Sequence, residues 1–179
     1  CRHDIQGNFK RPGIGLALRK QPSGLTTALG VSFNSSELLE QALTHRSAGQ
    51  PHNERLEFLG DAILGMIVAE RLFTLFPEAS EGQLSRLRAQ LVKRDTLAKI
   101  AREISLGEYL RMGSGELRAG GQSRDSTLSD ALEAFLGAVY LDLGTDAVEE
   151  VFNSLFEERL QQLDLSRSVK DPKTRLQEY

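Results

Sequence analysis

The sequence lacks several features that would place it in a well-defined class of protein. It has a single cysteine, at position 1. One cysteine cannot form an internal disulfide framework or a cysteine-ligated metal site, so the composition favours a reducing, cytoplasmic compartment. No run of about 18 apolar residues is present, and no transmembrane helix is therefore predicted. The pattern GxxxxGK[ST] is also missing, which excludes a nucleotide-binding loop of that type.

The chain has 179 residues, a hydrophobic content of 40% and a formal net charge of −3, which predict one domain with an apolar core, or one domain plus a fragment. The charge is divided unequally. Residues 81–124 contain nine basic and five acidic side chains, whereas residues 125–164 contain one basic and ten acidic ones. One region can therefore face phosphate groups while another holds a metal ion or faces solvent. Most basic side chains on helices are merely solvated, but four in the basic region are candidate phosphate contacts: Arg86, Arg88, Lys93 and Arg94.

The most informative stretch is HNERLEFLGDAIL, at residues 52–64. If it is helical, Glu54, Glu57 and Asp61 fall within roughly 60° of one another on the helix surface, next to apolar residues that predict a core-facing side. Three like charges on a half-buried face repel one another, and a bound cation would relieve that repulsion. Carboxylate oxygens without cysteine or paired histidines suit Mg²⁺ or Mn²⁺ rather than Zn²⁺.

A second acidic pair lies in DALEAFLGAVY, at residues 130–140. Asp130 and Glu133 are three residues apart and share one face of a predicted helix. Their neighbours are small or apolar, which predicts a largely buried helix without a local basic partner. The two acidic helices can pack together so that their carboxylates converge on one metal site. The simpler alternative is that the two clusters are unrelated, solvated faces.

The two motifs NERLEFLGDAIL and DALEAFLGAVYLD resemble the signature sequences of the ribonuclease III family, in the same order and with similar separation. The resemblance runs from about Leu25 to Tyr179. It implies an all-α fold, the ribonuclease III endonuclease domain, and a homodimer. It also implies metal-dependent hydrolysis of double-stranded RNA that leaves 5′-phosphate and 3′-hydroxyl ends with staggered cuts, as in RNA processing. The alternative is a catalytically silent protein that binds double-stranded RNA on the same fold.

The resemblance also implies roles for particular residues. Glu57, Asp130 and Glu133 would hold Mg²⁺, with Mn²⁺ able to substitute, and Asp61 would bind the ion directly or through water. Asp61 and Glu133 would form the essential catalytic pair.

Three further acidic or aromatic residues are assigned by resemblance to the substrate and dimer region: Glu54, Phe58 and Glu81. Phe58 would insert into the partner subunit, although an aromatic residue at such a position is usually part of its own core. Glu81 could instead be a favourable acid at a helix N-terminus. His45 is better explained as a packed or hydrogen-bonded residue than as a catalytic base.

The expected organisation has three parts. Residues 1–23 are an unassigned N-terminal extension, residues 24–164 form the nuclease domain, and residues 165–179 form a linker and the start of a truncated double-stranded-RNA-binding domain. The ending DPKTRLQEY resembles the first turns of a double-stranded-RNA-binding domain.

The hydrophobic pattern predicts helices over 25–29, 53–75, 81–94 and 146–163, with two more between them. One begins at Asn34 with a capping interaction to Glu37, and the other is capped by Asp95 and ends at Gly107. The stretch 112–124, with four glycines, is predicted to be a flexible basic loop. The buried face of the helix over 53–75 is expected to continue through four residues: Met66, Ile67, Leu72 and Phe73.

Overall fold

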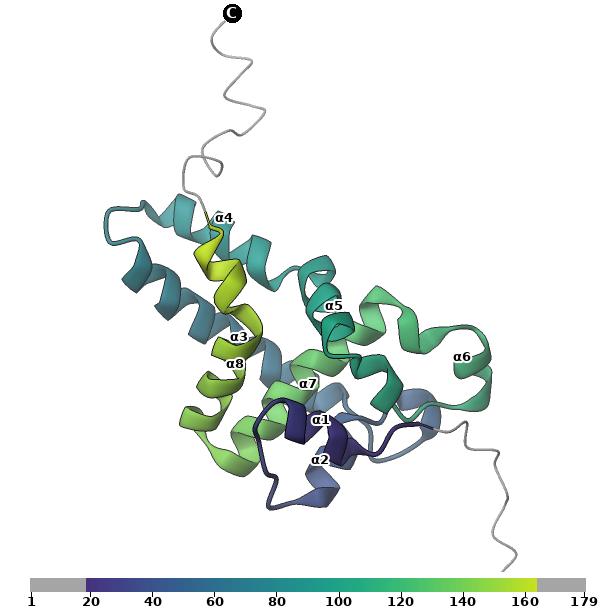
Figure 1. The fold of residues 1–179 in the computed structure, drawn as a ribbon. Helices are drawn as coiled ribbons and strands as arrows, with labels where there is room; N and C mark the ends of the chain where they lie inside the picture. Colours follow the sequence, from purple (N-terminus) through teal and green to yellow (C-terminus); the bar gives the residue numbers. More distant parts are fainter. Residues whose placement is uncertain (1–18, 164–179) are drawn as a thin grey trace, which may run out of the picture.

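The computed structural model describes residues 19–163, which form an assembly of helices (Figure 1). The predictions for residues 1–18 and for the linker and the ending DPKTRLQEY lie outside the described residues. Within them no strand occurs, and Thr44 and Arg111 form an isolated bridge. No helix in this part of the chain is both long and apolar enough to cross a membrane. The predicted all-α class is therefore confirmed.

The α-helices are α1 (Pro22–Ala28), α2 (Ser36–Ala42), α3 (Glu54–Leu75), α4 (Glu81–Val92), α5 (Arg94–Glu103), α6 (Ser114–Arg118), α7 (Asp125–Leu143) and α8 (Thr145–Gln161). The 3-10 helices are η1 (Arg46–Ala48), η2 (Leu106–Tyr109) and η3 (Gly121–Ser123).

Helix α7 is the centre of the fold. It packs against α2, α3, α5 and α8, and Figure 1 shows it in the middle of the molecule. Its small and apolar residues are buried on most sides, as the sequence predicts for this segment. Phe135 is fully buried, and so are Phe152 and Phe156 of α8, whose rings stack with centroids 4.6 Å apart. Burial of each large apolar side chain contributes about 1.5–3 kcal/mol, so α7 and α8 anchor the core.

Helix α3 begins and ends where the sequence predicts, but its apolar residues divide between two faces. Ile67 and Leu72 are buried, as expected, whereas Met66 and Phe73 are 55% and 72% exposed. The prediction that Met66 and Phe73 continue the buried face is therefore wrong. The helix carries apolar residues on two sides, and periodicity cannot tell which side meets the core of the protomer.

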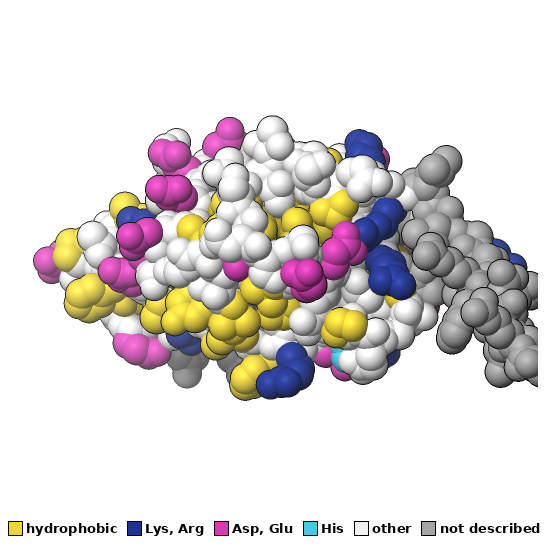
Figure 2. Space-filling model, turned by 90° about the horizontal axis from the view of Figure 1, so that it is seen from below, with side chains coloured by type: hydrophobic (Ala, Val, Ile, Leu, Met, Phe, Trp, Pro, Cys, Tyr) yellow, Lys and Arg dark blue, Asp and Glu magenta, His cyan; other side chains and the backbone are white. Residues whose placement is uncertain are grey.

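Several large hydrophobic side chains of the described chain are exposed at the protein surface. Figure 2 shows hydrophobic side chains gathered on one face of the molecule, with acidic side chains beside them. Such exposure is a common mark of an interaction surface. The large exposed hydrophobic residues of the described chain are Phe58, Met66, Phe73, Leu75 and Leu141.

Two helices begin at residues other than those predicted. Helix α1 begins at Pro22, because proline fits the first helical turn, where its missing N–H is not needed. Before α2 the cap is Ser35, whose hydroxyl accepts a hydrogen bond from the Leu38 N–H at 3.2 Å. The predicted cap Asn34 instead donates its backbone N–H to Asp142 at 2.6 Å. Asp142 lies far along the sequence, so local pattern could not reveal this bond.

The boundaries of α5 also differ from the prediction. The helix begins at Arg94 rather than being capped by Asp95, which lies in its first turn. It ends at Glu103, before Ser105, which adopts a left-handed backbone conformation with φ of 55°. That conformation stops the helix before Gly107, the predicted end.

The stretch 112–124 is ordered rather than a flexible loop, which corrects the prediction. It contains α6 and η3. Arg124 donates a hydrogen bond to Glu116 at 2.5 Å, and the Gly113 N–H donates to the Ser47 hydroxyl at 3.0 Å. These bonds tie the segment to itself and to η1, and this tertiary support replaces the flexibility expected from its glycines.

Candidate metal centre

The site is built by the close crossing of α3 and α7. A methyl group on Gly60 of α3 would overlap the backbone carbonyl of Glu133, with 2.5 Å to its carbon atom. A methyl group on Gly137 of α7 would overlap the Leu56 carbonyl oxygen and lie 3.1 Å from the Gly60 nitrogen. Each helix thus presents a glycine to the backbone of the other. Any larger side chain would force the helices apart, so the two glycines set the separation at which their carboxylates meet.

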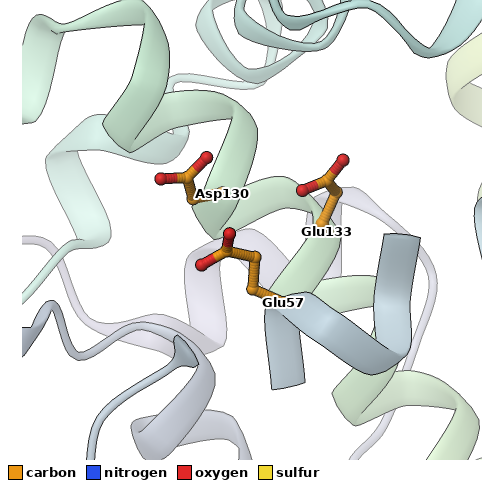
Figure 3. A group of neighbouring side chains, drawn as sticks. All are labelled: Glu57, Asp130 and Glu133. Atoms are coloured by element: carbon orange, nitrogen blue, oxygen red, sulfur yellow. The ribbon is translucent and has the colours of Figure 1, made fainter. Parts of the chain in front are cut away.

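Three carboxylates converge at this crossing. Glu57 comes from the first turn of α3, and Asp130 and Glu133 come from α7 (Figure 3). One oxygen from each lies within 4.8 Å of the others, and all three residues are half-buried. Oxygen ligands on opposite sides of one Mg²⁺ are about 4 Å apart, because each lies about 2.1 Å from the ion. The three side chains therefore fit a single hard divalent cation without a large rearrangement.

The electrostatics of the cluster also fit a cation. Burial, reinforced by the charges of Asp61, Asp130 and Glu57, raises the pKa of Glu133 to about 8. Burial, together with Asp130, Glu54 and Asp61, also raises the pKa of Glu57. The charged forms of these groups are disfavoured because they lose water and repel each other. A divalent cation at the centre would reverse both effects.

The carboxylates open into a pocket of about 810 Å³. Asp61 lines this pocket but stands outside the group of three whose oxygens lie within 4.8 Å. Glu54 also lines the pocket and forms an ion pair with Arg46 at 3.3 Å. Phe58 borders the same opening and is 80% exposed.

The remaining predicted site residues lie elsewhere. Glu81 is exposed in the first turn of α4 and accepts a hydrogen bond from the Ser85 hydroxyl at 2.7 Å. It does not line the pocket of the three carboxylates. The four candidate phosphate contacts on α4 and α5 and at their junction are exposed and also lie outside the pocket lining. Of these, Arg94 is near enough for its charge to oppose the upward pKa shift of Glu133.

A second wall of the pocket was not predicted. It is made by residues from η1 and its cap, from α6, and from the start of α7 with the residue before it: His45, Arg46, Ser47, Glu116, Arg124, Ser126 and Thr127. The prediction that His45 is a packed or hydrogen-bonded residue agrees with the structure, since its ring accepts a hydrogen bond from the Ser47 N–H at 3.2 Å. No sequence signal placed His45 beside the carboxylates, because His45 lies between α2 and α3 in a loop whose path only the fold defines.

Comparisons with known proteins agree with this architecture. A family model described as Ribonuclease-III-like matches residues 35–160. The chain is 58% identical over 155 residues to "Ribonuclease 3" of Hahella chejuensis, covering 87% of this chain and 69% of that protein.

Solved structures agree as well. The nuclease domain of ribonuclease III from Campylobacter jejuni is 42% identical, with a TM-score of 0.76, covering 81% of this chain and 99% of that one. A second structure of that domain, which describes flexibility in its region involved in dimer formation, has a TM-score of 0.75 at 42% identity, covering 77% and 97% of the two chains. From the family match and the extent of these identities, the chain belongs to the ribonuclease III family.

Proposed function

We propose that this chain is a metal-dependent endoribonuclease that hydrolyses double-stranded RNA and acts as a homodimer in RNA processing. One observation carries the proposal: Glu57, Asp130 and Glu133, from two motifs far apart in the sequence, converge within 4.8 Å in an open pocket. Membership of the ribonuclease III family supports RNA as the substrate. Staggered cuts and 5′-phosphate and 3′-hydroxyl ends are part of the proposal.

Glu57, Asp130 and Glu133 are proposed to hold Mg²⁺, for which Mn²⁺ can substitute. When bound, the ion lowers the pKa of a coordinated water and neutralises charge on the scissile phosphate. Asp61 lies one helical turn beyond Glu57 and lines the same pocket. Its carboxylate can orient a water molecule at the site, so Asp61 and Glu133 are proposed as the essential pair. Breaking the P–O3′ bond by water leaves the proposed ends.

A duplex of RNA suits a site that reads shape instead of base sequence. The A-form duplex is recognised mainly through phosphates, 2′-hydroxyls and groove shape. A dimer with two such pockets could cut both strands, one in each subunit, which accounts for staggered cuts.

The proposed dimer interface includes Phe58. This side chain is 80% exposed beside a groove of about 690 Å³ that is lined in part by Leu38, Leu59 and Leu141. Mutual burial of such groups across a two-fold axis would remove apolar surface from water. Glu54 and Glu81 are proposed to lie at the substrate and dimer surface.

The test is to incubate the purified chain with a long RNA duplex, with and without Mg²⁺. Cleavage is expected only with the ion. Glu57→Gln should be inactive, while Glu150→Gln, an exposed position on α8, should cleave like the wild type. Chelation should leave the helical circular dichroism largely intact, because the acidic residues lie on helices with extensive apolar faces. Duplex binding without any cleavage under these conditions would instead support a catalytically silent protein.

A further inference from the structure

The pocket has two walls of opposite character, and the proposed chemistry uses one of them. The carboxylates of α3 and α7 form the acidic wall. The other wall carries hydrogen-bond donors, among them His45, Arg46 and Arg124. An RNA strand brings anionic oxygens that the acidic wall repels. Hydrogen-bond donors on the other wall would offset that repulsion for the RNA oxygens that do not contact a metal ion.

His45 differs from the two arginines on this wall. Arg46 is paired with Glu54 at 3.3 Å, and Arg124 is paired with Glu116 at 2.5 Å. The imidazole of His45 has no carboxylate partner in the described part of the chain. Burial lowers the pKa of His45, so the ring is neutral at neutral pH. A neutral donor can face the carboxylates without competing with a cation for them.

The hydrogen bonds of the ring define its tautomer. The Ser47 N–H donates to Nδ1 at 3.2 Å, and the Ser47 hydroxyl lies 2.8 Å from the same nitrogen. A backbone N–H can only donate, so Nδ1 must accept and cannot carry the proton of the neutral ring. The proton is therefore on Nε2. Among the described residues none accepts a hydrogen bond from this Nε2–H.

The ring is also held in place from the backbone side. The His45 N–H donates to the Arg111 carbonyl at 2.9 Å, and the Arg111 N–H donates to the Leu43 carbonyl at 2.8 Å. The Ser47 hydroxyl accepts the Gly113 N–H at 3.0 Å. The neighbouring segment 111–113 thus fixes the loop that presents the ring. A donor that is oriented before binding loses little conformational entropy when it meets its acceptor.

We infer that His45 is a substrate-positioning residue whose Nε2–H donates a hydrogen bond to a backbone oxygen of the RNA strand beside the scissile bond. The acceptor is a phosphate oxygen or a 2′-hydroxyl. This inference rests on the proposed function, because it assumes that RNA occupies the pocket. His45 takes no proton in the reaction and holds no metal.

Two substitutions separate this role from a purely structural one. In His45→Asn the side-chain oxygen can take the place of Nδ1 and accept the Ser47 N–H, but no donor reaches the place of Nε2. In His45→Gln an amide N–H₂ reaches approximately the place of Nε2. The inference predicts that His45→Asn lowers single-turnover kcat/KM by about 10-fold, the effect of one hydrogen bond, with Gln close to the wild type. A structural role predicts the reverse order.

The outcomes are distinct. Wild-type-like cleavage by His45→Asn, or an equal loss in both variants, would overturn the donor assignment. Thermal unfolding of both variants checks that the loop survives. If the wild type itself fails to cleave duplex RNA with Mg²⁺, the proposed function fails before this inference is reached.

A substrate-side measurement locates the acceptor on the RNA and compares the wild type with His45→Asn, whose folding is checked by thermal unfolding. Duplexes carry a single 2′-deoxy or a single methylphosphonate substitution at successive positions beside the cut. One position should slow the wild type by about 10-fold and slow His45→Asn no further, since the same hydrogen bond is already lost. If the cleavage rate falls at a 2′-deoxy position, the acceptor is a 2′-hydroxyl. If it falls at a methylphosphonate position, the acceptor is a phosphate oxygen. Additive losses at every position would refute the contact.

Discussion

Gly60 and Glu133 are in direct backbone contact, although 73 positions separate them in the sequence. The α-carbon of Gly60 faces the carbonyl of the residue whose side chain is the most electrostatically perturbed in the site. The same contact that lets α3 and α7 approach each other therefore places Glu57 opposite Asp130 and Glu133. The packing of the core and the geometry of the candidate metal centre depend on one crossing.

Replacing Gly60 by alanine should damage both stability and activity. The added methyl group overlaps backbone, which cannot rotate away, so the helices must separate. We expect the free energy of unfolding to fall by about 1–3 kcal/mol. The cleavage rate should fall by about 100-fold if the carboxylates shift by about 1 Å. Chemical denaturation and single-turnover kinetics measure the two effects.

The control is Gly115→Ala, where an added methyl group meets nothing within 4 Å. It should leave stability nearly unchanged. A Gly60→Ala protein with wild-type stability and wild-type rate would show that the crossing tolerates a wider separation.

Glu133→Gln should separate chemistry from binding. The substitution keeps the size of the side chain and removes one negative charge. The cleavage rate is expected to fall by at least about 100-fold, because losing even a group that only supports a metal ligand costs about 10- to 100-fold. Affinity for duplex RNA should stay equal or rise, since one charge near the phosphates is gone. Single-turnover cleavage and filter binding on one duplex measure both.

Raising Mn²⁺ is expected to restore part of the activity of Glu133→Gln, because this ion binds such sites more tightly than Mg²⁺. Arg88→Gln, on the exposed side of α4, is expected to weaken RNA binding, whereas Glu133→Gln is expected to slow cleavage without weakening binding. If Arg88 contacts phosphate, binding weakens and its salt dependence flattens. A Glu133→Gln protein that cuts at the wild-type rate would remove Glu133 from the proposed site.

Stability without metal should decrease as pH rises. The pKa of Glu133 is raised from 4.5 to about 8 in the folded protein. Between these values the folded state keeps a proton that the unfolded state has lost, so each step up in pH favours unfolding. The contribution of this group is fully present below pH 4.5 and is lost as pH rises through about 8.

In a chelating buffer near pH 8, Glu133→Gln should therefore be more stable than the wild type by about 2 kcal/mol, a value reduced because the carboxyl is partly exposed. This corresponds to an increase of about 4–8 °C in Tm. The difference should vanish near pH 4. Scanning calorimetry of both proteins across this range decides the point, and a constant difference at all pH values would argue against a raised pKa.

Phe58→Ala should weaken dimerisation without destabilising the protomer. The ring is 80% exposed, so the protomer loses little packing when it is removed. A buried aromatic at an interface commonly contributes about 2 kcal/mol or more, which is about a 30-fold change in the dimer Kd. Sedimentation at micromolar concentration measures it, with Glu150→Ala as the control. An unchanged dimer constant would assign Phe58 to a minor contact.

The sequence by itself indicated the main helices and the acidic residues of the candidate centre, and its resemblance to the ribonuclease III family implied the all-α class. The spacing of acidic and apolar residues in NERLEFLGDAIL placed Glu57 on a core-facing helix, and DALEAFLGAVY did the same for Asp130 and Glu133. Such patterns are local, because a helix repeats its faces every few residues. The limits of α3 were predicted for the same reason, since Pro77 and the polar residues before Glu54 lie next to them in the chain.

The tertiary structure alone decided how these pieces meet. Periodicity marked apolar residues on α3 but could not distinguish Ile67, which faces the protomer core, from Phe73, which is exposed. The glycine-rich stretch 112–124 is ordered because Ser47 and Glu116 support it. Asn34 just before α2 donates its backbone N–H to Asp142, more than a hundred residues away.

The same holds for the site. Gly60 and Gly137 carry no chemical signature, yet their contacts set the distance between the carboxylates. The donor wall with His45 lies in the same pocket as the acids, and its loop is held by hydrogen bonds to Arg111 and Gly113, which are distant in sequence. These relationships join residues that are distant in sequence, and only packing, which excludes overlap and pairs buried polar groups, makes them neighbours.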